Sequence, residues 1–228
     1  LINSSRTPQC MAFLPYNKMR CSWRNWTVAR GAFEDTVGDI ADATGIPYDQ
    51  NLGWSALGTL AGRNLVTVAD LDRAAQYNPS SISKNGYAFA IAAIPDADHK
   101  AAAYKRIMED SSLSNDALTS TANGFLRGDV ELRTPYYKPF FDSLLSMWDT
   151  RSIGMATRIV RGLYPRSLYN YGSAEGTGVS DNPSVALAQE WLHKNPSAPS
   201  ALRRLILEAQ DNAHRNMIGQ QFNSSLSD

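Results

Sequence analysis

Two neighbouring stretches of apolar residues between Tyr136 and Pro165 constrain the fold of this chain more than any other feature. In the first stretch the apolar residues recur at steps of three and four: Phe140, Phe141, Leu144, Leu145 and Trp148. In the second stretch the same spacing holds: Ile153, Ala156, Ile159, Val160 and Leu163. This spacing places each set on one face of a helix. Neither helix can bury its apolar face alone, so we expect the two to pack on each other and on further helices.

Capping residues and prolines mark where several expected helices begin and end. Ser152 is an N-cap candidate for the second helix of the pair, and Pro165 would stop it. Thr67 with Asp70 forms a capping pattern, and Ser114 offers a further cap. Other expected helices share such boundaries: 29–43, 50–62, 80–94, 96–109, 185–195 and 201 to about 222. In the helix at 50–62 we expect four side chains to face inward: Leu52, Trp54, Leu57 and Leu60.

The sequence therefore predicts an all-α fold, because no segment shows the strict alternation of a half-buried strand. About eleven helices of about 11 to 15 residues, joined by short loops, would form antiparallel pairs. This pairing is typical of a HEAT-like superhelical solenoid with the shape of a bowl. We assign residues 1–30 to an irregular, linker-like N-terminal segment and residues 31–228 to the helical domain. Residues 169–183, rich in glycine and small polar residues, form a second linker-like stretch.

Charge and hydropathy exclude several classes of function. The 22 basic residues are balanced by 22 acidic ones, so the formal net charge is zero. Proteins that bind nucleic acid normally carry a basic surplus or a basic stripe, so we expect no nucleic-acid partner. No apolar run reaches the length of about 18 residues that a membrane helix needs, so we expect no membrane association.

The two cysteines bear on the cellular compartment. Cys10 and Cys21 could form a disulfide, but so sparse a use of cysteine favours two free thiols in a reducing cytoplasm. We therefore expect a cytoplasmic protein. The sequence begins at Leu1, without an initiator methionine or a signal-peptide pattern, and we interpret it as a piece of a longer chain.

The three histidines argue against a zinc site in this chain. His99, His193 and His214 do not form the His-Glu-x-x-His pattern, which places two imidazoles on one helix face beside a glutamate. The Gly-x-Ser-x-Gly motif of hydrolases and the phosphate-binding P-loop are also missing from the sequence. We therefore assign no catalytic residue and no metal ligand to this chain.

Two tyrosines and four arginines remain as candidates for contacts with a ligand: Tyr136, Tyr137, Arg158, Arg161, Arg203 and Arg204. Guanidinium groups match carboxylates well, so some of these arginines could face a cavity and attract a peptide carboxylate. The tyrosines could line the same cavity. The alternative is structural: ion pairs along the helices, such as Arg204 with Glu208, and interface packing of the tyrosines.

Several segments together resemble the C-terminal region of the M1 zinc aminopeptidases, the actinobacterial aminopeptidase N type above all. The clearest segments are 115–125, 137–148 (YKPFFDSLLSMW), 159–165 (IVRGLYP), 191–192, 201–204 (ALRR) and 208–215. Residues 52–54 and 96–103 match more loosely. The resemblance extends from about residue 50 to residue 222 and is weak before residue 30. Each segment consists mostly of packing residues, so the order and spacing of the segments make the resemblance specific.

The resemblance implies that the chain is the all-helical, HEAT-like bowl that ends an M1 enzyme. The parent enzyme would remove N-terminal residues from peptides with a single zinc ion. In the family the zinc ligands and the catalytic glutamate lie upstream, so the resemblance implies no cofactor in this chain. Its partners would be the upstream catalytic domain of the same polypeptide and the peptide substrate. The C-terminal domain would close the active-site cavity and restrict or position that peptide.

Two other classes of function compete with this interpretation. A free-standing helical-repeat module would bind a peptide or a protein on its concave face. An independent hydrolase is disfavoured, because no nucleophile, base and orienting group can be named. If the chain normally packs on missing domains, an apolar patch would be exposed, and we therefore expect a tendency to dimerise.

Overall fold

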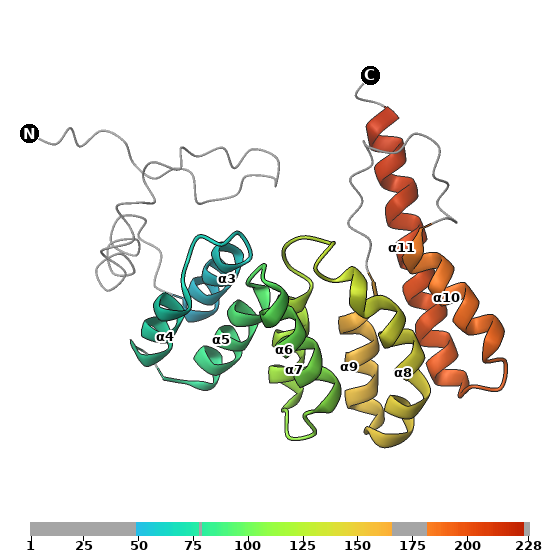
Figure 1. The fold of residues 1–228 in the computed structure, drawn as a ribbon, viewed down its shortest axis with the longest axis horizontal. Coiled ribbons are helices and arrows are strands. Elements are labelled where there is room, and N and C mark those ends of the chain that lie inside the picture. The colour runs from blue at the N-terminus through green and yellow to red at the C-terminus, as the bar shows by residue number, and fades with distance from the viewer. Residues whose placement is uncertain (1–48, 78, 166–181, 226–228) are drawn as a thin grey trace, which may run out of the picture. The chain divides into compact units, whose positions relative to one another are not determined.

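The computed structural model describes residues 49–77, 79–165 and 182–225 (Figure 1). In these ranges the chain forms nine α-helices, one 3-10 helix and no strand, so the predicted all-α fold is confirmed. The helices are α3 (Gln50–Ala61), α4 (Val68–Tyr77), α5 (Ser81–Ala93), α6 (Ala97–Glu109), α7 (Asn115–Phe125), η3 (Thr134–Tyr136), α8 (Tyr137–Thr150), α9 (Ile153–Leu163), α10 (Pro183–Lys194) and α11 (Ser200–Ser225). The chain divides into two units, Leu1–Gly53 and Trp54–Asp228, and the packing that follows belongs to the second.

Three predicted elements lie wholly or partly outside the described residues: the segment at 1–30, the helix at 29–43 and the linker at 169–183. The described end of that linker belongs to α10 instead. The Asn182 side chain accepts a hydrogen bond from the Ser184 amide (2.9 Å), and Pro183 is the first helical residue. Proline suits this place because the first N–H of a helix has no partner within the helix. The domain boundary after residue 30 stays a prediction.

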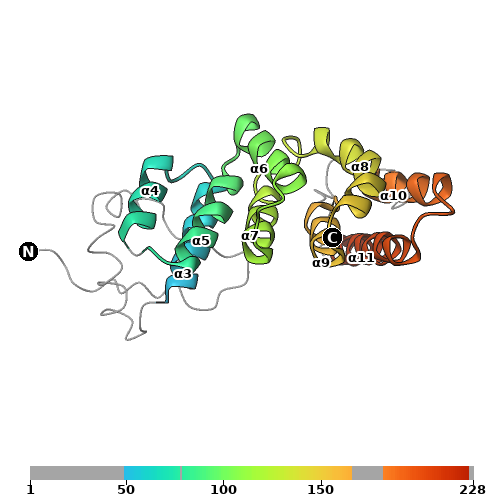
Figure 2. The ribbon, with the colours of Figure 1, turned by 90° about the horizontal axis from the view of Figure 1, so that it is seen from below.

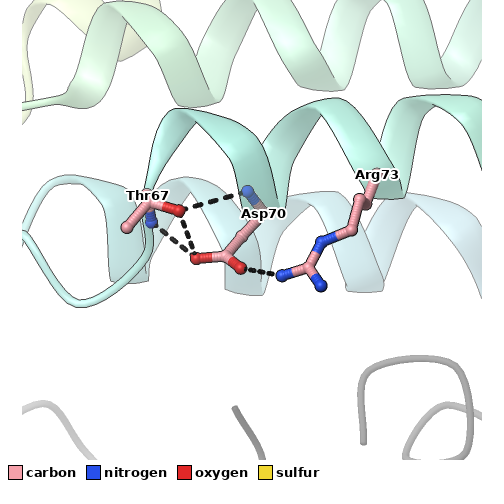
Figure 3. Close-up of polar contacts among 3 residues, drawn as sticks. All are labelled: Thr67, Asp70 and Arg73. Carbon is pink, nitrogen blue, oxygen red and sulfur yellow. Dashed lines mark hydrogen bonds and ion pairs between the residues drawn. The ribbon is translucent and has the colours of Figure 1, made fainter. Parts of the chain in front are cut away.

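Short polar side chains cap the first turns of several helices. At the start of α4, the Asp70 carboxylate accepts hydrogen bonds from the amide (2.8 Å) and the hydroxyl (2.7 Å) of Thr67 (Figure 3). The Thr67 hydroxyl in turn accepts one from the Asp70 amide (3.3 Å), and Arg73 forms an ion pair with Asp70. Four further N-caps are Ser80, Asp96, Ser114 and Ser152. These contacts satisfy amides that the first turn leaves unpaired, and the predicted caps at Thr67, Ser114 and Ser152 are confirmed.

Helices of the second unit contact one another in a regular order. Consecutive helices pack as pairs, with α4 on α5, α6 on α7, α8 on α9 and α10 on α11. Helices α5, α7, α9 and α11 also contact one another in this order and form a continuous series, and α8 contacts α10 (Figure 1, Figure 2). This order follows the predicted pairing of helices, while the HEAT-like solenoid stays a prediction.

The apolar faces of α8 and α9 form part of one core, as their spacing predicts. Their buried residues are Tyr137, Phe140, Phe141, Leu144, Met147, Ala156, Ile159, Val160 and Leu163. The rings of Phe141 and Tyr164 meet edge to face, with centroids 6.0 Å apart. Full burial of a large apolar side chain contributes about 1.5–3 kcal/mol before entropy is counted. This core fixes the C-terminal end of α9, which borders the candidate site.

Three apolar residues that the sequence places on inward faces are exposed: Leu52 (63%), Leu145 (37%) and Ile153 (72%). Leu52 lies about 200° around α3 from the buried Trp54, on the opposite side of the helix. Ile153 is the first residue of α9, ahead of Ala156, the first buried residue of that helix. The prediction for Leu52 is wrong because two residues of a helix that are two positions apart do not share a face. The predictions for Leu145 and Ile153 are wrong because periodicity locates an apolar face but not how much of it the neighbouring helices cover.

Small residues allow α5 and α7 to approach closely. A Cβ atom added to Gly124 of α7 would lie 2.1 Å from the carbonyl oxygen of Phe89 and 2.9 Å from the Cβ atom of Ala92, both on α5. Glycine is required at this position because no side chain fits between the two backbones. The C-terminal end of α7 therefore lies directly against α5.

Candidate functional site

A groove with a volume of about 480 Å³ lies between the C-terminal end of α9 and the middle of α11. Its lining residues come from these two places: Arg161, Tyr164, Leu205, Glu208, Ala209, Asn212, Ala213 and Asn216. The six from α11 recur at three- and four-residue spacing, which places them on one face of that helix. The volume lies within the range of about 300–1,000 Å³ that is usual for ligand sites. We call it the α9–α11 groove.

The floor of the α9–α11 groove is buried and its rim is polar. Tyr164, Leu205 and Ala213 are buried, and the Tyr164 hydroxyl donates a hydrogen bond to the carbonyl oxygen of Ser184 (3.0 Å). Burial raises the pKa of Tyr164, so this phenol stays neutral at physiological pH. The exposed polar side chains of the lining are Arg161, Glu208, Asn212 and Asn216. Such a set supplies both donors and acceptors, which a peptide backbone requires of its binding site.

The charges of the groove come from Arg161 and Glu208. Glu208 forms an ion pair with Arg204, one turn earlier on α11, with 3.3 Å between Nε and Oε1. Both side chains are exposed, so the pair contributes at most about 1 kcal/mol to stability. A bound ligand could therefore displace it at little cost. Arg161 is the cation among the lining residues and is the natural partner for a ligand carboxylate.

The four predicted arginines do not meet in one site. Arg161 lines the α9–α11 groove, whereas Arg158 is exposed and donates a hydrogen bond to the carbonyl oxygen of Gly154 (3.1 Å). Arg204 does not line the groove and reaches it only through its ion pair with Glu208. The ligand contacts predicted for these side chains stay predictions.

Arg203 has a clear structural role. One of its terminal nitrogens donates hydrogen bonds to the carbonyl oxygens of Leu192 (2.7 Å) and Asn195 (2.6 Å). These oxygens lie at the C-terminal end of α10, where helix carbonyls have no partner within the helix. Arg203 thereby joins the end of α10 to the start of α11.

The two predicted tyrosines also lie away from the groove. Tyr136 packs against the rings of Tyr104 (4.7 Å between centroids) and Phe125 (5.5 Å). Tyr137 is buried at the start of α8, and burial raises its pKa. Both tyrosines therefore pack inside the fold, as the structural alternative given for them proposes. Their role as substrate contacts stays a prediction.

Two buried cations, Lys100 and Arg133, were not among the predicted residues. Lys100 is fully buried, and its Nζ donates hydrogen bonds to main-chain oxygens, the closest being that of Ala92 (2.7 Å). In the sequence, Lys100 lies three residues before Ala103 and seven before Ile107, both buried. That spacing is the signal that could have placed Lys100 on the inner face of α6. No comparable pattern surrounds Arg133.

The described residues do not fit a zinc site. The Nδ1 atom of His99 lies 3.0 Å from the Oδ1 atom of Asp96, and His193 and His214 are exposed on other helices. Within residues 49–77, 79–165 and 182–225, no group of three or more His, Cys, Asp or Glu side chains could hold a metal ion. Cys10 and Cys21 lie outside these ranges. No helix in the same part of the chain is long and apolar enough to cross a membrane.

Comparison with known proteins places this fold. Residues 27–215 match the family described as the ERAP1-like C-terminal domain. Aminopeptidase N of Streptomyces lividans is 26% identical over 200 residues, which cover 85% of this chain but only 22% of that protein. The chain thus spans about a fifth of the length of this relative. Because the family match extends over most of the sequence, the chain belongs to the family of ERAP1-like C-terminal domains.

Proposed function

We propose that this chain is the non-catalytic C-terminal domain of an M1 zinc aminopeptidase of the aminopeptidase N type. The parent enzyme hydrolyses N-terminal residues from peptides, with its zinc ion bound in an upstream catalytic domain of the same polypeptide. The observation that carries the proposal is the family match over residues 27–215, together with a similarity that covers only 22% of Aminopeptidase N. A match of this kind is expected of one domain from a longer enzyme.

In this proposal the domain closes the active-site cavity and restricts or positions the peptide. The α9–α11 groove supports such a role because it combines an apolar floor with polar side chains on its rim. The Arg161 guanidinium would bind a carboxylate or a backbone carbonyl of the peptide. Asn212 and Asn216, one turn apart on α11, would exchange hydrogen bonds with its amides.

A peptidase assay on the chain alone tests the absence of catalysis. Hydrolysis of a panel of aminoacyl-fluorophore substrates is measured with and without added zinc, and circular dichroism checks that the chain is helical. We expect no turnover above background under either condition. Zinc-dependent turnover would show that the chain holds a metal site of its own, and the proposal would be wrong.

A binding assay tests the α9–α11 groove. Fluorescence anisotropy compares a labelled peptide that has a free C-terminal carboxylate with the same peptide as a C-terminal amide. Arg161→Gln should weaken binding of the carboxylate peptide about tenfold or more, since a hydrogen bond to a charged group contributes about 1.5–3 kcal/mol. Arg158→Gln, on the same helix but outside the groove, is the matched control and should bind like the wild type. Equal losses in both variants, or none, would reject the role of the groove.

Location and self-association complete the proposal. The sparse use of cysteine supports a cytoplasmic protein, which fractionation of the source cells would test. If surfaces that pack on the upstream domain are exposed, the isolated chain should dimerise at high concentration. A monomer in light scattering at high concentration would contradict that expectation.

A further inference from the structure

Lys100 of α6 joins the C-terminal ends of two other helices. Its Nζ lies 2.7 Å from the carbonyl oxygen of Ala92 on α5 and 2.9 Å from that of Arg127, which follows α7. The carbonyl oxygens of Gly124 and Phe125, both on α7, lie 3.3 Å away. All four oxygens belong to the last turn of a helix or to the residues just after it, where carbonyls lack a partner within the helix. One ammonium group therefore caps two helices at once.

A second buried cation holds the segment between α7 and η3, residues 126–133. Arg133 is 1% exposed, and two of its side-chain nitrogens lie 3.4 and 3.5 Å from the carbonyl oxygens of Gly128 and Asp129. Among the described residues, neither Lys100 nor Arg133 forms an ion pair with a carboxylate. Two buried cations thus bind main-chain oxygens of the segment that connects α7 to η3 and fix its conformation.

Opposing effects act on the charge of Lys100, which its four carbonyl acceptors favour and its burial disfavours. Burial disfavours a charged amine, and a neighbouring cation disfavours it further. Arginine does not lose its proton in proteins, so the repulsion between the two cations can be removed only by deprotonation of Lys100. Burial lowers the pKa of Lys100 to about 7, the charge of Arg133 adds to this effect, and Asp129 opposes it. Both charged neighbours come from residues 126–133, while α5 and α7 contribute carbonyl oxygens and the Phe125 ring, 5.9 Å from Nζ.

We propose that Lys100 is a proton-controlled latch, which holds α5, α7 and residues 126–133 together when charged and loosens them when neutral. The ammonium has three N–H donors for the four carbonyl oxygens. The neutral amine has two donors and directs a lone pair at the remaining oxygens. A buried carbonyl that loses its donor is destabilised, so local opening at the end of α7 becomes easier. This inference does not depend on the proposed function.

The titration of Lys100 tests the first half of the inference. The side-chain ¹³Cε resonance of Lys100 is followed by NMR from pH 5 to pH 11 on the full chain, and its absence from the spectrum of Lys100→Met assigns it. We expect a midpoint between about pH 6 and pH 8. A midpoint above about pH 8.5, toward the ordinary lysine value of 10.5, would overturn the latch, because Lys100 would stay charged at physiological pH.

Amide hydrogen exchange tests the second half. The amides of Leu126 and Arg127 donate to the carbonyl oxygens of Ala122 (3.2 Å) and Gly124 (2.9 Å), so they report opening at the end of α7. Their protection, corrected for intrinsic exchange, should fall about tenfold across the Lys100 midpoint, the effect of losing one hydrogen bond to a charged donor. Constant protection across the midpoint would refute the latch.

Two variants complete the experiment. Lys100→Met should show low protection of these amides at every pH, and Lys105→Met, at an exposed position on the same helix, should behave like the wild type. A pH-dependent loss of protection that persists in Lys100→Met would assign the effect to another group and overturn the proposal. If Lys100→Met does not fold, single methionine variants of the other five lysines assign the Lys100 resonance by exclusion: Lys18, Lys84, Lys105, Lys138 and Lys194. The wild-type titration and exchange data then still test the proposal.

Discussion

The contact between α5 and α7 offers a sharp test of the structure, because Gly124 meets the backbone of α5. In Gly124→Ala the new Cβ atom would lie 2.1 Å from the carbonyl oxygen of Phe89. A carbon–oxygen contact needs about 3.3 Å, so the two helices would have to separate by about 1.2 Å. Overpacking costs about 1–3 kcal/mol, and a helix backbone cannot rotate away, so we take about 3 kcal/mol. Alanine favours the helix by about 1 kcal/mol. The free energy of unfolding should therefore fall by about 2 kcal/mol.

Urea denaturation followed by far-UV circular dichroism measures this change. The matched control is Gly219→Ala on α11, where the added Cβ atom would meet no atom within 4 Å. That variant gains helix propensity without a clash and should be more stable than the wild type, by up to about 1 kcal/mol. The two substitutions are chemically identical, so the difference between them isolates the effect of packing.

The sign of the change in the free energy of unfolding of Gly124→Ala tests whether α5 and α7 approach this closely. If this variant were as stable as the wild type or gained stability like Gly219→Ala, α5 and α7 would not approach as closely as the structure shows. A change in the slope of the urea transition would instead indicate an altered denatured state or a loss of two-state unfolding. In that case thermal unfolding by calorimetry would supply an independent comparison.

Three further tests address single contacts in the same urea assay. Thr67→Ala removes the N-cap of α4 and should cost about 1 kcal/mol, whereas Thr67→Ser keeps the capping hydroxyl and should leave the stability nearly unchanged. Arg203→Met leaves the carbonyl oxygen of Leu192 without a donor, whereas that of Asn195 keeps the Ala198 amide (3.3 Å), and the substitution should cost about 1–3 kcal/mol. Arg204→Met should cost less than about 1 kcal/mol, and equal costs would contradict the capping role. Burial and the hydrogen bond to Asp72 raise the pKa of Tyr87 from 10.0 to about 12. As the pH rises, the unfolded chain therefore loses this proton before the folded chain does. The free energy of unfolding should fall as the pH rises from 10.0 to about 12. Tyr87→Phe should reduce that fall, and an unchanged pH profile would contradict the assignment.

Helix positions could be predicted from the sequence because their causes are local. The cap at Thr67 depends on Asp70, three residues away, and Ser114 and Ser152 act over the same short distance. The apolar faces of α8 and α9 follow from the helical repeat alone. For the same reason the all-α fold and the pairing of neighbouring helices could be predicted without any knowledge of tertiary contacts.

The candidate site was predictable only in part. Arg161 could be singled out because it lies three residues after Arg158 on an expected helix, but periodicity does not show which of the two lines the groove. That distinction depends on α11, which packs beside α9 although it begins about forty residues later. Asn212 and Asn216 were missed because polar residues on a long helix normally indicate a solvated face.

Burial of charge is the clearest feature that only the tertiary structure decided. Helical spacing places Lys100 on the same face of α6 as Ala103 and Ile107, but its charge is enclosed only because α5 and α7 both end beside it and supply carbonyl oxygens. Ile153 shows the converse, an apolar residue in the correct register that no neighbouring helix covers. The sequence by itself determined which residues form helices and which face of each is apolar, since hydrogen bonding and side-chain spacing act within a few residues. How much of each face is covered, and which charges are enclosed, was decided by helices that meet only in the folded chain.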